Sequence, residues 1–232
     1  MKRTFALLLV TLGPLCPLAN GYAPTSAYER QTICGWTVFV NRGLSGEHGE
    51  LADEVLELLK FQLYQIARVV PDEALGALRN VPIWVEYKHP RHPCMCYHPS
   101  RQWLTENDFN PEKAGSVEIA NAENFLTWTI GQPWMVLHEL AHAYHHQVVG
   151  YDHAELKRLF KSAGGSATYD SVLHISGEFR RAYALNNDQE YFAECTEAFF
   201  GTNDFFPFVR AELKRHDPEM YGLLAKLWKV DE

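Results

Sequence analysis

Two histidines and a glutamate form the part of the sequence best suited to chemistry. The segment HELAH places His138 and His142 four residues apart, with Glu139 beside the first histidine. On a helix this spacing brings both imidazoles to one face, where they can share a tetrahedral metal ion. Glu139 can then act as general base on a water that the metal activates. The motif predicts a catalytic Zn²⁺ site; the alternative is a solvated polar helix face.

The third metal ligand must come from elsewhere in the chain. His145 follows His138 by seven residues, which is a rise of about 10.5 Å along a helix and too far for a shared zinc ion. Position 148 is Val, so the metzincin pattern of three histidines fails. We interpret His145 and His146 as groups that support the ligands from outside, that lie at the rim of the pocket, or that lie on the surface.

A second segment, NDQEYFAE, carries suitable carboxylates. On a helix Glu190 and Glu194 share one face, so we expect Glu190 to bind zinc and Glu194 to accept a hydrogen bond from a ligand histidine. Asn187 lies beside them and is expected in the same outer layer. This gives a His-His-Glu site with an open fourth position. Two alternatives remain: Asn187 and Glu190 also form a capping box, and Glu194 and Glu197 suit a charged surface.

These residues support a family resemblance. HELAH, followed 48 residues later by the NDQEYFAE segment, resembles the catalytic domain of anthrax lethal factor and its relatives, which are gluzincin-type zinc endopeptidases. The resemblance covers roughly residues 117–205 and extends to small secreted bacterial proteins proposed to be metallopeptidases. It implies Glu190 as the ligand and Tyr183, seven residues earlier, as a donor to the transition-state oxyanion. Tyr191 replaces the first Phe of the family pattern.

The expected activity is hydrolysis of peptide bonds by a single zincin-like domain. In zincins a sheet edge before the zinc helix binds substrate as an added strand, and the resemblance assigns that role to Ser116–Ala120. The aromatic segment Tyr97–Trp103 either lines specificity pockets or is a structural loop held by disulfides. Two other functions remain open: zinc-dependent amide hydrolysis on a cell-wall substrate, and a non-catalytic exported zinc-binding module.

The pattern of apolar residues predicts an α+β fold. Strand composition appears at Thr37–Asn41, Val81–Tyr87 and Val117–Ala120, and a hairpin turning at Ser176-Gly177 is expected within Tyr169–Ala184. Residues 22–31 suggest a loose lead-in, and residues 88–114 suggest a long ordered loop. Helices are predicted at Glu50–Val70, Pro133–Val149, Asp188–Phe200 and Pro218–Val230.

The N-terminus indicates export. Lys2 and Arg3 precede an apolar run and a small-residue cleavage pattern at Ala19-Asn20-Gly21, so residues 1–21 are expected to be a signal peptide and 22–232 the metallopeptidase domain, secreted or periplasmic. No stretch reaches the length of a membrane span. The net charge of −8 argues against nucleic acid partners, and we expect a monomer acting on peptide or protein substrates.

The cysteines permit disulfides. Cleavage after residue 21 removes Cys16 and leaves four, which allow two bridges in three possible pairings. The four are Cys34, Cys94, Cys96 and Cys195. A bridge between Cys94 and Cys96 would be strained, and a zinc ion on these cysteines is a weaker possibility because paired C-x-x-C units are lacking.

Overall fold

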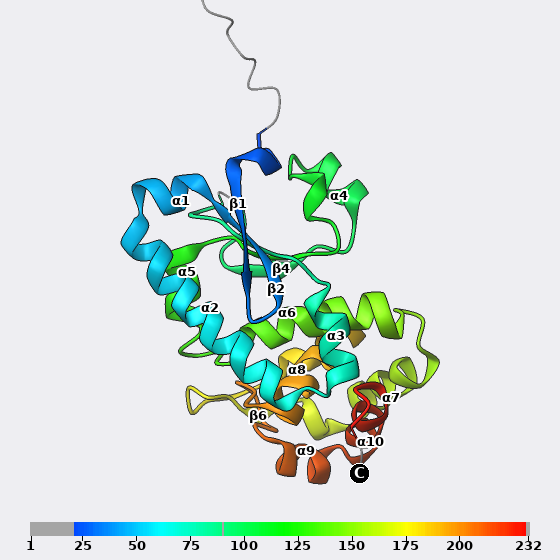
Figure 1. Cartoon of the computed structure of the whole chain (residues 1–232). Coiled ribbons are helices and arrows are strands. Elements are labelled where there is room, and N and C mark those ends of the chain that lie inside the picture. Colours follow the sequence, from blue (N-terminus) through cyan, green and yellow to red (C-terminus); the bar gives the residue numbers. More distant parts are fainter. Residues whose placement is uncertain (1–20, 90, 231–232) are drawn as a thin grey trace, which may run out of the picture.

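The computed structural model describes residues 21–89 and 91–230 as one α+β domain (Figure 1). The expected signal peptide lies outside this range except for Gly21, and so does Cys16. In the described part of the chain, no helix combines the length and apolar character that crossing a membrane requires.

A five-stranded mixed sheet organises the N-terminal half. Its strands lie in the order β1-β2-β3-β5-β4. Their bounds are Tyr28–Ile33 (β1), Trp36–Asn41 (β2), Ile83–Val85 (β3), Met95–Tyr97 (β4) and Val117–Ile119 (β5). β2, β3 and β5 run parallel, whereas β1 and β4 pair antiparallel to their neighbours. β4 is therefore an antiparallel edge strand.

Helices supply the remaining layers. Those in the N-terminal half are α1 (Arg42–Glu47), α2 (Gly49–Val69), α3 (Asp72–Arg79), α4 (Arg101–Glu106) and α5 (Ala122–Trp128). The others are α6 (Met135–Tyr144), α7 (Ala154–Gly165), α8 (Asp188–Phe200), α9 (Arg210–His216) and α10 (Pro218–Leu227). A two-stranded hairpin, β6 (Val172–Leu173) and β7 (Phe179–Arg180), precedes α8.

One face of the sheet packs into the main core. Val38, Val40, Ile83, Val117 and Ile119 alternate with polar or aromatic neighbours and are almost fully buried. Burial of such side chains is the main favourable term in folding, at roughly 1.5–3 kcal/mol each. The opposite face carries buried polar and charged groups, among them Glu118.

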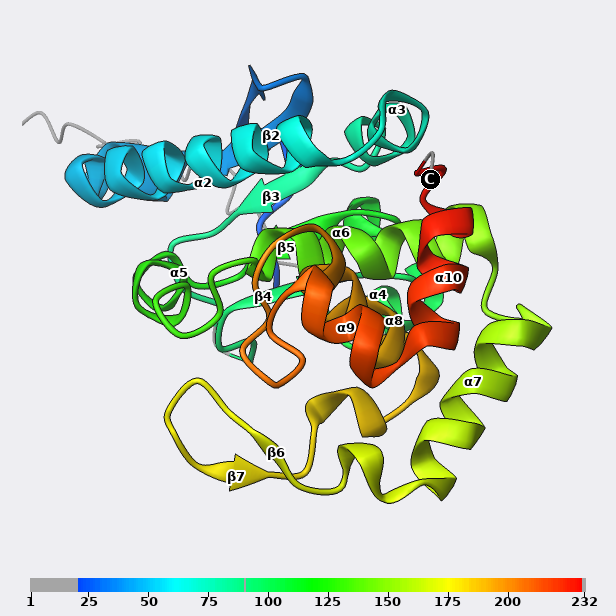
Figure 2. The ribbon, with the colours of Figure 1, turned by 90° about the horizontal axis from the view of Figure 1, so that it is seen from below.

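α6 lies between the two halves of the molecule. It contacts α2 and the strands β4 and β5 on one side and packs along α8 on the other. In Figure 2, α2 and the strands β2 and β3 lie above α6, while α8, α9, α10 and the β6–β7 hairpin lie below it. Residues from the HELAH segment and the NDQEYFAE segment therefore face each other although they are about fifty positions apart.

Several predicted elements are confirmed, with small changes of boundary. Helix α2 ends just before Pro71, α8 occupies Asp188–Phe200 as expected, and the hairpin turns at Gly177, where φ is +85°. The helix predicted at Pro133–Val149 is α6 only as far as Tyr144; residues His145–Val149 form a π-helical turn.

Three expectations are wrong. The supposed lead-in at 22–31 contains much of β1, and the supposed loop at 88–114 contains β4 and α4. The segment Ser116–Ala120 is not a sheet edge, because β5 pairs with β3 on one side and with β4 on the other. A three-residue strand is too short to show alternation in sequence, which explains why β4 was missed.

The cysteines do not form the expected disulfides. Cys34, Cys94, Cys96 and Cys195 are all free thiols. Cys195 is buried within α8 near the hydroxyl of Tyr169, and Cys34 is a half-buried residue near Lys60. Residues 94–98 are therefore held by pairing with β5 and not by a bridge among the described cysteines.

Candidate metal centre

Helix α6 presents the two histidines of HELAH on one face. The leucine and alanine positions of the motif are fully buried, which fixes the rotation of the helix. His138 and His142 consequently project from the same side, with their Nε2 atoms 3.1 Å apart. Both side chains are 13% exposed, so they open onto a cavity and not onto bulk solvent.

Helix α8 supplies the carboxylate. The side chain of Asn187 accepts hydrogen bonds from the backbone N–H groups of Gln189 and Glu190, and so begins the helix. In the first turn of α8, Glu190 Oε2 lies 3.0 Å from His138 Nε2 and 3.3 Å from His142 Nε2. Asn187 thus acts as a helix cap that sets the position of Glu190. Its side-chain oxygen bonds backbone N–H groups of α8.

The three donor atoms form a nearly equilateral triangle. Donors that lie about 2.0–2.1 Å from a tetrahedral zinc ion are about 3.3 Å from each other. The observed separations of 3.0, 3.1 and 3.3 Å are close to this value. His138, His142 and Glu190 therefore match the dimensions of a three-ligand zinc site.

Electrostatics also favour a cation at this point. Burial alone lowers the pKa of His138, but its hydrogen bonds with Glu190 and Glu197 outweigh this and raise it well above the usual value. Burial raises the pKa of Glu190, but its hydrogen bonds with His138 and His142 outweigh this and lower it to about 2. The pocket holds positive charge strongly, either as protons or as a metal ion.

The carboxylate that orients His138 is Glu197. Its Oε1 lies 2.7 Å from His138 Nδ1, whereas Glu194 Oε1 is 3.8 Å away. When His138 donates its Nδ1–H to Glu197, the Nε2 lone pair faces the centre of the triangle, as metal ligation requires. The expectation that Glu194 makes this bond is wrong. Glu197 follows Glu190 by seven residues, or two helical turns, so it shares the face of Glu190 as well as Glu194 does. This spacing could be read from the sequence.

Glu194 belongs to a buried acidic group behind the histidine. It accepts a hydrogen bond from Asn203 Nδ2 at 3.2 Å. Burial, followed by the charge of Glu197, raises the pKa of Glu194 well above its usual range. Burial raises the pKa of Glu197 as well, but its hydrogen bond with His138 opposes this, so Glu194 retains a proton more readily than Glu197 does.

Glu139 is held by the edge strand. Its Oε2 accepts the backbone N–H of Tyr97 at 2.8 Å, on the last residue of β4. Cys94 and His98 make their backbone bonds to the β5 side, so by alternation the backbone groups of Met95 and Tyr97 point away from the sheet. The sequence suggested that Tyr97 lines a specificity pocket, but its contact with Glu139 was not foreseen, because the contact comes from a backbone N–H that sequence patterns do not show.

Tyr183 stands at the entrance of the site. It begins a 3₁₀ turn, Tyr183–Leu185, and is 46% exposed. Two adjoining cavities of about 160 and 300 Å³ both include Tyr183, His138, Glu139 and Met95 in their walls. Burial and the nearby Glu190 raise the pKa of Tyr183, so its hydroxyl remains a proton donor.

Of the two extra histidines, His145 is neither a surface group nor a group at the pocket rim, whereas His146 is half-buried. His145 is fully buried between Phe192 and Tyr151, and neither ring nitrogen has a hydrogen-bond partner in the described part of the chain. Burial lowers the pKa of His145 to about 4. His146 stacks on Tyr151, and its Nδ1 lies 2.7 Å from the Tyr97 hydroxyl.

Comparisons with protein-family models, curated proteins and solved structures gave no significant match. The functional argument therefore depends on the residues and geometry of the site itself.

Proposed function

We propose that this chain is a secreted zinc-dependent metallopeptidase with a zincin-like fold, in which His138, His142 and Glu190 hold the ion. The observation that carries the proposal is the triangle of two imidazole nitrogens and one carboxylate oxygen, with sides of 3.0–3.3 Å, directly beside Glu139. When bound, a zinc ion here supplies Lewis-acid chemistry and water activation. The resemblance to gluzincins of the lethal factor type points the same way.

The chain's own residues suit the remaining steps. Glu139 takes a proton from the attacking water and later delivers it to the leaving amine, as a general base and then a general acid. Tyr183 donates its hydroxyl to the oxyanion as charge develops there. Glu197 holds the His138 ring in the orientation that keeps Nε2 free.

The substrate is proposed to be an extended peptide. The backbone groups of Met95 and Tyr97 that point away from β5 lie along the cavity wall, and a strand edge of this kind can bind an extended chain by main-chain hydrogen bonds. β4 takes the role that the sequence suggested for Ser116–Ala120. The Tyr97 N–H now held by Glu139 becomes available when Glu139 turns toward a water in the cavity.

The test compares three variants of residues 22–232. Glu190→Gln should lower zinc retention, whereas Glu139→Gln should keep zinc and lose cleavage of a mixed peptide library. Glu123→Gln, an exposed glutamate on α5, is the matched control and should change neither. Zinc retention that is unaffected by Glu190→Gln would refute the ligand assignment.

The same assay decides between substrate classes. Protein, peptide and cell-wall fragments are offered in parallel to the zinc-loaded protein. Cleavage of cell-wall amides alone would replace the peptidase proposal with an amide hydrolase. Stoichiometric zinc with no hydrolysis of any substrate would indicate a non-catalytic zinc-binding module.

A further inference from the structure

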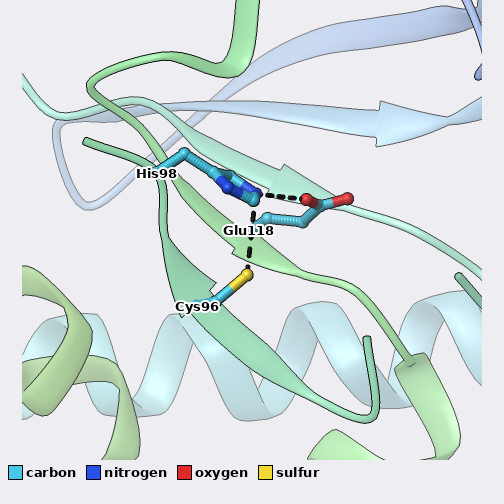
Figure 3. A group of neighbouring side chains, drawn as sticks. All are labelled: Cys96, His98 and Glu118. Atoms are coloured by element: carbon cyan, nitrogen blue, oxygen red, sulfur yellow. Dashed lines mark hydrogen bonds and ion pairs between the residues drawn. The ribbon is translucent and has the colours of Figure 1, made fainter. Parts of the chain in front are cut away.

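A second cluster of metal-binding side chains lies on the other face of the sheet. Cys96 on β4 is the cross-strand partner of Glu118 on β5, so their side chains share a face. His98 follows two residues after Cys96 and returns to the same face. Figure 3 shows the three side chains pointing toward one another across the two strands.

The distances between these atoms suit a divalent metal. Cys96 Sγ is 3.6 Å from His98 Nε2, and a thiolate and an imidazole on one tetrahedral zinc ion are about 3.6 Å apart. His98 Nε2 is 2.5 Å from Glu118 Oε2, a hydrogen-bond distance. An ion bound between these two atoms must move them apart by about 0.8 Å to reach ordinary ligand spacing.

The surroundings are built for a charged group. His98 and Glu118 are 4% and 0% exposed, and Lys113 Nζ bonds the other oxygen of Glu118 at 2.5 Å. Lys113 also pairs with Glu86, which accepts a hydrogen bond from the Tyr28 hydroxyl. Glu118 can therefore offer Oε2 to a metal while Lys113 keeps Oε1 in place, the outer support that ligand carboxylates commonly have.

The charges of the cluster balance when a divalent ion is bound. The ion and Lys113 together carry three positive charges, which cancel those of the Cys96 thiolate, Glu118 and Glu86. No uncompensated charge is then buried.

We propose that Cys96, His98 and Glu118 form a second, thiolate-containing site for zinc or a similar divalent transition ion. Cysteine, histidine and carboxylate together select this class over magnesium or calcium. The ion would tie β4 to β5 next to Tyr97, whose N–H positions Glu139. The site is separate from the His138 centre and does not depend on the chain being a peptidase.

Cobalt(II) distinguishes the two sites by spectroscopy. The three proposed ligands of the His138 centre contain no sulfur, so a near-ultraviolet thiolate-to-cobalt charge-transfer band is expected from the Cys96 site alone. Metal-free residues 22–232, kept reduced, are titrated with Co²⁺; we expect two bound ions per chain and this band. Cys96→Ser should remove the band and one bound ion. His98→Gln should weaken the band and lower the affinity for the same ion. His142→Ala should remove the other ion and leave the band unchanged.

Cys34→Ser is the matched cysteine control and should leave the band and both ions unchanged. As a second measurement, bound Zn²⁺ should protect Cys96, but not Cys34, from alkylation as mapped by mass spectrometry. A wild-type protein that binds one cobalt ion without the band, or a band that persists in Cys96→Ser, overturns the second site. Neither result bears on the His138 centre.

Discussion

Replacing Glu197 tests the most specific feature of the proposed metal centre. The pair Glu197 Oε1 and His138 Nδ1 is 2.7 Å apart, with side chains 4% and 13% exposed. A hydrogen bond to a charged group contributes roughly 1.5–3 kcal/mol, and outer-shell partners of metal-binding histidines change affinity by about 10–100-fold. Glu197→Gln keeps the shape and an acceptor oxygen but removes the charge. We therefore expect zinc affinity to fall by about 10–100-fold.

The assay is competition for Zn²⁺ against a chromogenic chelator, carried out in a Cys96→Ser background so that the His138 centre is titrated by itself. Glu194→Gln is the matched comparison, because Glu194 lies one turn away but 3.8 Å from the same nitrogen, beyond hydrogen-bond range. It should weaken zinc binding much less. A larger loss for Glu194→Gln than for Glu197→Gln, or no loss for Glu197→Gln, would refute the reasoning.

Three further predictions concern other residues of the same architecture. Tyr183→Phe should lower kcat by about 10²–10³-fold with zinc content unchanged, measured by peptide cleavage and metal analysis; loss of zinc would contradict the oxyanion role. His145, with a folded pKa lowered from 6.5 to about 4, stabilises the fold less as pH falls from 6.5 toward 4, because the unfolded state binds the proton first. In His145→Phe, the free energy of unfolding measured in urea should vary less between pH 6.5 and 4, by up to about 3 kcal/mol. A pH profile equal to that of the wild type would contradict this. In Gly201→Ala the new Cβ would meet the Trp134 ring at 2.0–2.5 Å, so the free energy of unfolding should fall by about 1–3 kcal/mol, whereas Gly164→Ala in α7, with nothing within 4 Å, should leave it unchanged or slightly higher; equal effects would disprove the clash.

The local elements were largely predictable because their signals are local. Apolar spacing and Pro71 defined α2, and Asn187 and Gly201 bracketed α8. The short strand β4 and the helix α4 were not predictable, because residues 88–114 are rich in His, Pro and Cys and show no period. The edge of the sheet depends on strand order, which is set by packing between segments far apart in sequence.

The sequence by itself determined which side chains could hold a metal. Helical spacing places His138 and His142 on one face and Glu190 on the face of another helix, since that depends only on the 3.6-residue repeat. Only the tertiary structure decided how these faces meet, that Glu197 and not Glu194 reaches His138, and that Tyr97 holds Glu139. It also brought Cys96 opposite Glu118 through strand pairing. Which of two neighbouring turns or strands reaches a given partner depends on the distance and angle between the two elements. Close packing of the whole core fixes that distance and angle.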